Sequence, residues 1–146
     1  MKTYPYSVPN GVNIVPEASG ASNLGTAAKP FSGTYSNQYA TTLYTTVGES
    51  GLNTINWNSG TSQKLNFANA QSGVATIELT NGIAGSSYVL TTMANNSGTT
   101  SIAWSGTMLW KGGTTGTMTV ASGSSDLFSF YYDGSTYFGN VGNDYK

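Results

Sequence analysis

Short runs of alternating apolar and polar residues recur about every ten residues between Leu52 and Val141. Clusters such as NSGTS, NGIAGSS and KGGTTG, which are rich in turn-forming residues, separate these runs. This spacing is typical of an all-β sandwich or barrel, and no segment shows a convincing helical stripe. The pattern therefore predicts strands at residues 53–57, 63–67, 74–79, 88–93, 101–104, 109–110, 117–120, 126–132 and 136–141.

The last two predicted strands flank an Asp133-Gly134 pair. Asp-Gly suits the two positive-φ positions of a type I′ turn, so a hairpin is predicted here. Phe128, Phe130 and Tyr132 then share one face of the hairpin. We interpret these rings as core and subunit contact, since a small sandwich needs large buried side chains. The alternative is an exposed aromatic platform.

Charged residues make up only 8% of the 146-residue chain, which has a net charge of -1 and no Arg. This excludes nucleic-acid binding by phosphate neutralisation. No apolar run reaches membrane-spanning length, so membrane insertion is not expected. No signal peptide is visible, and synthesis in a cytoplasm is expected. Lys64 and Glu78, on solvent faces of two predicted strands, are candidates for a weak cross-strand ion pair.

The chain lacks Cys and His, which removes thiolate chemistry and the commonest general base. Its carboxyl groups fall in irregular segments, at turns, on an exposed strand face or at a strand start, and none has a catalytic context. We therefore predict a protein that is not an enzyme and that uses no metal or cofactor. The six carboxyl residues are Glu17, Glu49, Glu78, Asp126, Asp133 and Asp144.

The first 21 residues contain prolines at positions 5, 9 and 16, which exclude a helix or a central strand. Apolar side chains lie between these prolines. We interpret residues 1–21 as an extended N-terminal anchoring arm, with a frayed terminus as the alternative. Residues 22–51 would form a connecting segment and 52–146 the β-sandwich domain. The candidate anchoring residues are Tyr4, Tyr6, Val12 and Ile14.

Trp104 and Trp110 lie at or near the ends of predicted strands. Aromatic residues in such positions cap a sandwich core or line a sugar-binding groove. We favour capping, because indole N–H groups often reach the rim of a core. Contact with a glycan on a host surface is the alternative role for these two residues.

Two stretches resemble structural proteins of tailed bacteriophages. The segment NLGTAAKPFSGTY (residues 23–35) is similar to a Leu-Gly-x-x-x-x-Pro-Phe…Tyr pattern near the trimeric shafts of phage fibres. The segment at residues 100–142 resembles a C-terminal module of virion-surface proteins, with Trp-x-Gly-Gly followed by Asp-x-Phe-x-Phe-Tyr-x-Asp-Gly-x-x-Tyr-x-Gly. The resemblance implies a jelly-roll-like antiparallel β-sandwich, homotrimeric, on the outer surface of a virion.

No long shaft separates the arm from this module. The expected function is therefore a trimeric capsid decoration, cement or short head-fibre protein, whose arm binds the major capsid protein or another virion protein. The alternatives are a receptor-binding tail-fibre component and a carbohydrate-binding module.

Overall fold

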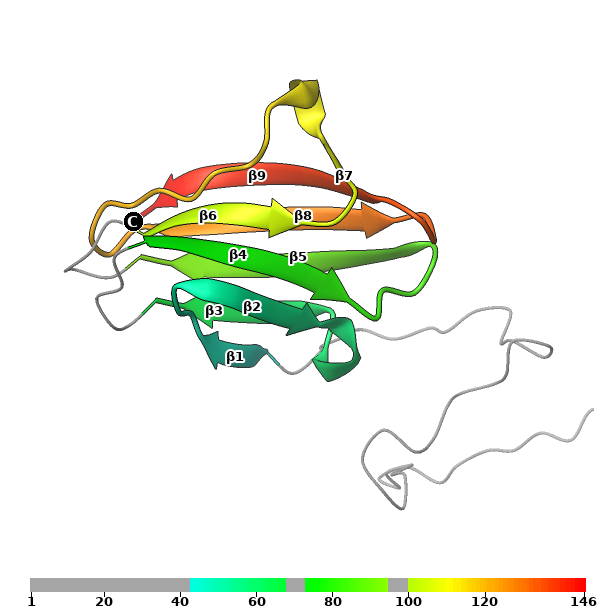
Figure 1. The fold of residues 1–146 in the computed structure, drawn as a ribbon, viewed down its shortest axis with the longest axis horizontal. Helices are drawn as coiled ribbons and strands as arrows, with labels where there is room; N and C mark the ends of the chain where they lie inside the picture. The colour runs from blue at the N-terminus through cyan, green and yellow to red at the C-terminus, as the bar shows by residue number, and fades with distance from the viewer. Residues whose placement is uncertain (1–42, 68–72, 95–99) are drawn as a thin grey trace, which may run out of the picture. The chain divides into compact units, whose positions relative to one another are not determined.

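The computed structural model describes residues 43–67, 73–94 and 100–146. In these residues the chain forms two β-sheets that lie face to face (Figure 1). The larger sheet has the strand order β1-β3-β5-β8-β9-β7, and the smaller has the order β2-β4-β6. The all-β prediction is confirmed. The strands are β1 (Tyr44–Val47), β2 (Gly51–Asn56), β3 (Ser62–Asn66), β4 (Gly73–Thr80), β5 (Ser86–Met93), β6 (Thr100–Ser105), β7 (Met108–Trp110), β8 (Ser125–Tyr132) and β9 (Tyr137–Tyr145).

From β1 to β6 the chain alternates between the two sheets, so that each turn of chain places one strand in each. Strands β1, β3 and β5 run parallel to one another, and so do β2, β4 and β6. We call β1–β6 the coiled part. The chain then forms β7 at the far edge of the larger sheet and closes with the antiparallel pair β8 and β9.

The strand directions differ from the expected antiparallel jelly roll. Five of the seven strand pairings among the described residues are parallel, and only β5–β8 and β8–β9 are antiparallel. The connections within the coiled part are three to six residues long. Such connections reach about 10–20 Å, enough to cross the roughly 10 Å between stacked sheets. The chain therefore crosses to the opposite sheet where a hairpin was expected.

The core lies between the two sheets and is lined by the alternating inward residues of each strand. Phe128 and Phe130 are buried, as the sequence predicts, and Tyr132 is partly buried. Ile77 from the smaller sheet and Leu65 and Leu90 from the larger one complete its centre. Two short 3-10 turns, Trp57–Ser59 and Lys111–Gly113, connect strands.

The predicted strand at 117–120 is absent, although the segment is extended and buries Met118. The sheets also begin earlier than the predicted boundary at residue 52, because β1 and the first residue of β2 precede it. The compact unit runs from Ala40 to Lys146. Lys64 and Glu78 lie in different sheets, so the expected ion pair between them does not form; Glu78 instead accepts a hydrogen bond from Thr54 at 3.3 Å.

The β8–β9 hairpin forms as predicted, but its turn is not type I′. Only Gly134 has a positive φ, of 110°, and the loop spans residues 133–136. The Asp133 carboxylate accepts hydrogen bonds from the backbone N–H groups of Ser135 and Thr136, at 2.8 and 2.7 Å. These bonds, led by that from Ser135, lower the pKa of Asp133. A side-chain-capped turn thus replaces the tighter two-residue loop.

Candidate interaction surface

The predicted anchoring residues Tyr4, Tyr6, Val12 and Ile14 lie outside the described residues, and their role stays a prediction. The two candidate glycan residues, Trp104 and Trp110, are both partly buried.

The indoles of Trp104 and Trp110 pack on each other, with ring centroids 5.1 Å apart. Trp104 also meets Phe128 and Phe130 edge-on, at 5.0 and 5.4 Å, and its Nε1 donates to the Gly116 carbonyl at 2.8 Å. These contacts direct the rings toward the core. They favour the capping interpretation over a sugar platform.

Trp110 fits its site because two glycines leave room for its ring. A Cβ atom on Gly139 would lie 2.8 Å from the Trp110 ring, and one on Gly116 would lie 2.5 Å away. Neither distance is compatible with an unshifted side chain. The glycine at position 139, which ends the Tyr-x-Gly pattern, is therefore a packing requirement of the fold.

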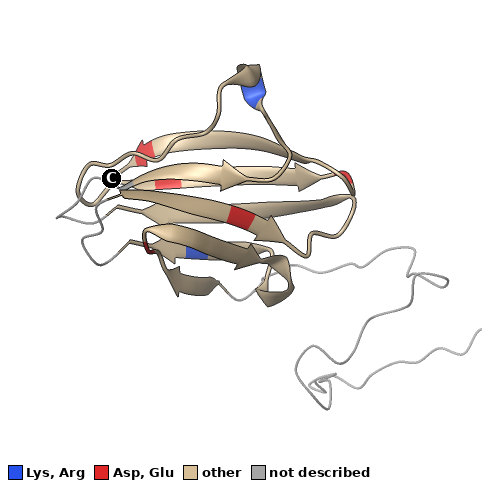
Figure 2. Ribbon diagram, viewed as in Figure 1, with Lys and Arg blue, Asp and Glu red and all other residues tan. Residues whose placement is uncertain are grey.

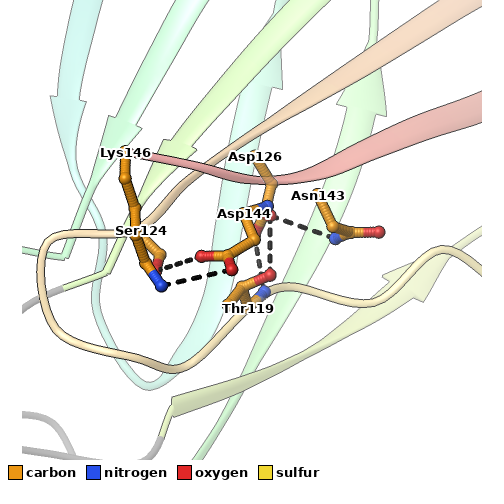
Figure 3. Close-up of polar contacts among 6 residues, drawn as sticks. All are labelled: Thr119, Ser124, Asp126, Asn143, Asp144 and Lys146. Atoms are coloured by element: carbon orange, nitrogen blue, oxygen red, sulfur yellow. Dashed lines mark hydrogen bonds and ion pairs between the residues drawn. The ribbon is translucent and has the colours of Figure 1, made fainter.

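A polar cluster, which the sequence did not reveal, joins three segments at the open end of the hairpin, away from its turn (Figure 3). Asp126 on β8 is only 1% exposed. Its carboxyl oxygens accept hydrogen bonds from the Thr119 N–H at 2.5 Å, the Thr119 hydroxyl at 2.8 Å, the Asn143 amide at 3.1 Å and the Asp144 N–H at 2.8 Å. We call this arrangement the Asp126 clasp.

Asp144 extends the clasp toward the C-terminus. Its carboxylate accepts a hydrogen bond from the buried Ser124 hydroxyl at 2.8 Å and pairs with Lys146 at 3.2 Å (Figure 3). The Ser124 bond, followed by that from Lys146, lowers the pKa of Asp144. Its φ of 61° is unusual for a residue other than glycine.

The oxygens of Asp126 are therefore occupied by protein donors, and the clasp is best explained as a structural pin. A glycoside hydrolase needs two carboxyl groups that face a substrate across a cleft, which a carboxyl group buried among its own donors does not do. Within the described ranges, no three His, Cys, Asp or Glu residues lie close enough together to hold a metal ion. Nor do those ranges contain a helix of membrane-spanning length and apolarity.

A tyrosine cluster fills the opposite end of the hairpin. Tyr132 and Tyr137 stack with centroids 4.4 Å apart, and Trp57 stacks on Tyr88 at the same distance. Burial raises the pKa of the Tyr137 hydroxyl. Both Tyr137 and Tyr132 pack against Gly82, where a Cβ atom would collide with them.

The residues best placed to contact another molecule lie on the outer face of the larger sheet. Leu109, Leu127, Tyr131 and Phe138 are 55, 41, 47 and 43% exposed, although each is large and apolar or aromatic. The Tyr131 and Phe138 rings lie 6.3 Å apart. We call these four residues the outer aromatic face. Clustered apolar side chains that remain exposed in one subunit commonly mark a protein contact.

Charge is sparse over the described chain, and Figure 2 shows none on β7 or along the central stretches of β8 and β9. The sequence did indicate the outward direction of Leu127 and Tyr131, because they alternate with the buried phenylalanines. It did not indicate that Phe138 lies opposite Tyr131 and that Leu109 lies beside Phe138, since that requires the pairing of β9 with β8 and with β7. In comparisons with known proteins, no family model, no curated protein and no solved structure matches this chain.

Proposed function

We propose that this chain is a non-enzymatic structural protein of the exterior of a tailed-bacteriophage virion. It acts as a homotrimeric capsid decoration, cement or short head-fibre protein, anchored through its N-terminal arm to the major capsid protein. The observation that carries the proposal is the outer aromatic face, a set of exposed uncharged side chains on the segment that resembles virion-surface modules.

Five residues of the resembling pattern have an identifiable role in forming this module. Asp126 forms the clasp, Phe128 and Phe130 fill the core, Asp133 caps the turn, and Tyr137 stacks on Tyr132. The pattern therefore specifies a β-module with a defined outer surface. It contains no residue set with the geometry of a reaction site, which favours a structural role.

Tyr131, a further position of the pattern, is half exposed and belongs to the outer aromatic face. A residue that contributes little to the core of its own subunit supports a role in contact between molecules. This is consistent with a protein whose stability and attachment depend on assembly.

The arm is tested by deleting residues 2–20 and measuring co-sedimentation with capsids of the parent phage that lack this chain. We expect the truncated protein to remain a folded oligomer and to lose attachment, because the arm supplies the capsid contact. A full-length variant with Tyr4, Tyr6, Val12 and Ile14 changed to Ser is the matched control for chain length, and it should also lose attachment. Full occupancy by both proteins would refute the anchoring role.

The two alternative functions predict different results for the same purified protein. A receptor-binding tail component would bind host cells and block phage adsorption when added as purified protein. A carbohydrate-binding module would change its tryptophan fluorescence on titration with a glycan panel. We expect neither response from a capsid decoration protein.

A further inference from the structure

The outward side chains of β7, β9, β8 and β5 form three rows that follow the strand pairing. The first row contains the bulkiest side chains, the second is mainly small and polar, and the third is mixed. The rows are Leu109, Phe138, Tyr131 and Ser87; then Asn140, Ser129 and Val89; then Gly142, Leu127 and Thr91.

None of these ten residues carries a charge. The third row continues on β3 with Lys64, the cross-strand partner of Thr91. One cation at this edge is not the cluster of charges that would attract nucleic acid or an anionic membrane. The polar side chains are one Tyr, two Ser, one Thr and one Asn, and each both donates and accepts hydrogen bonds. The first two rows, which contain Tyr131, Phe138 and Asn140, are compatible with a second copy, because contact between them brings no like charges together.

We propose that the outer aromatic face is the contact between copies of this chain, with Tyr131 and Phe138 at its centre. Tyr131 and Phe138 are direct cross-strand partners, and Leu109 continues the row on β7. Aromatic side chains at the centre of an interface commonly supply most of the binding free energy. This inference rests on the oligomer of the proposed function, but it does not require attachment to a virion.

The proposed occupant fits this surface better than a glycan does. The Tyr131 and Phe138 rings are tilted by 43° and touch each other, so they form a ridged cluster rather than a flat platform for sugar rings. Ridged apolar surfaces interdigitate well with a second protein surface. Copies can meet face to face about a two-fold axis or converge on a three-fold axis, and the light-scattering mass distinguishes these arrangements.

The outer surface of the smaller sheet provides a matched control. It also exposes apolar residues, with Leu52 at 65% and Val74 at 52%, but Glu78 lies among them on the central strand. A contact formed merely by exposed apolar side chains would involve both surfaces. A contact formed by the outer aromatic face would not change when Leu52 and Val74 are replaced.

The test measures the mass of the full-length protein by size-exclusion chromatography with light scattering, over a dilution series. The wild type should be an oligomer, and the double variant Tyr131→Ser/Phe138→Ser should weaken association by at least about 100-fold. The control Leu52→Ser/Val74→Ser should match the wild type. Near-ultraviolet circular dichroism reports whether each variant is folded.

The variant Asn140→Glu provides a second test, because Asn140 is exposed in the middle row and the core does not depend on it. Each copy would bring an added carboxylate into the contact, where it loses water without gaining a partner, so this variant should also dissociate. A wild-type monomer throughout would overturn both this inference and the trimer of the proposed function. If the oligomer persists both in Asn140→Glu and in a folded Tyr131→Ser/Phe138→Ser variant, this inference alone is overturned.

Discussion

The coiled part and the hairpin end of the molecule bury polar side chains in different ways. In the coiled part, Asn53 and Gln63 bond to backbone groups no more than seven residues away in sequence. At the hairpin end, the clasp joins Asp126 to residues 17 and 18 positions later, and Asp144 to Ser124 across 20 positions. The long-range polar bonds of the coiled part come instead from exposed or part-buried side chains, such as Thr54 to Glu78 and Thr80 to the Ile55 carbonyl. The buried polar side chains therefore shape individual turns in the coiled part and hold separate segments together at the hairpin end.

This difference indicates how each region is stabilised. A coil of parallel strands grows by stacking each turn of chain on the one before, so local bonds within a turn are sufficient. The hairpin end must hold β8, β9 and the extended segment before β8 in one arrangement, although their pairing is distant in sequence. Long-range polar bonds fix that arrangement because buried donors and acceptors must all be satisfied.

The largest expected effect is a difference in stability between removing a buried polar side chain at the hairpin end and removing one in the coiled part. Asp126→Ala removes four hydrogen bonds and leaves the Thr119 and Asp144 N–H groups without acceptors, so we expect a loss of about 3–5 kcal/mol in the free energy of unfolding. Asn53→Ala removes three bonds within one turn and should cost about 1–2 kcal/mol. Urea denaturation followed by tryptophan fluorescence measures both.

Asp126→Asn is the matched control for size, since its amide keeps one acceptor oxygen. We expect it to fall between the wild type and Asp126→Ala. Equal losses for Asp126→Ala and Asn53→Ala would contradict the contrast between long-range and local anchoring.

A smaller effect of opposite sign is expected beside the clasp. Thr92 on β5 is the direct cross-strand partner of Asp126 and is fully buried, yet its hydroxyl has no hydrogen-bond partner. Thr92→Val replaces that hydroxyl with a methyl group of similar size, so we expect stabilisation of about 1 kcal/mol. The same denaturation experiment measures the change. A clear loss of stability would show that the Thr92 hydroxyl contributes to the clasp.

The strand positions were largely predictable from the sequence, because alternation of buried and exposed residues is a local property. Ile77 and Leu65, for example, alternate with polar neighbours in their own strands. Strand direction was not predictable. A strand with one buried face has the same alternation whether its neighbour is parallel or antiparallel, and connections of five or six residues serve a hairpin or a crossing equally well.

The Asp126 clasp also could not be predicted from the sequence. Asp126 stands at the start of its predicted strand, where polar residues are common, and its donors come from residues that only the fold brings near. Residues 117–120 resembled a strand because their residue types favour extended backbone. Instead, Asp126 accepts the Thr119 N–H and Asn143 donates to the Thr117 carbonyl at 2.8 Å, so side chains replace strand pairing.

The smallest expected effect is a difference in how Asp144 and Asp133, the two exposed carboxylates of the hairpin, change the stability of the fold with pH. The pKa of Asp144 is lowered from 3.8 by the Ser124 hydroxyl and Lys146, and that of Asp133 is lowered by the backbone N–H groups of its own turn. A folded-state pKa below the unfolded value means that each carboxylate stabilises the fold above about pH 4. This contribution is lost as the pH falls through the lowered pKa.

Asp144→Asn should therefore differ most from the wild type near neutral pH, and the difference should shrink in acid. Both asparagine variants keep an acceptor oxygen, but Asp144→Asn also loses the ion pair with Lys146, so the difference for Asp133→Asn should be smaller at every pH. Denaturation midpoints from pH 7 to pH 2.5 measure both variants. Hydrogen exchange adds a regional readout, because loss of the Asp144 contacts should expose amides at the end of β9, whereas loss of the Asp133 charge should affect only the turn. Equal pH profiles for the two variants would mean that the Asp144 contacts are only local, as those of Asp133 are, and that Asp144 does not hold the C-terminal residues to Ser124.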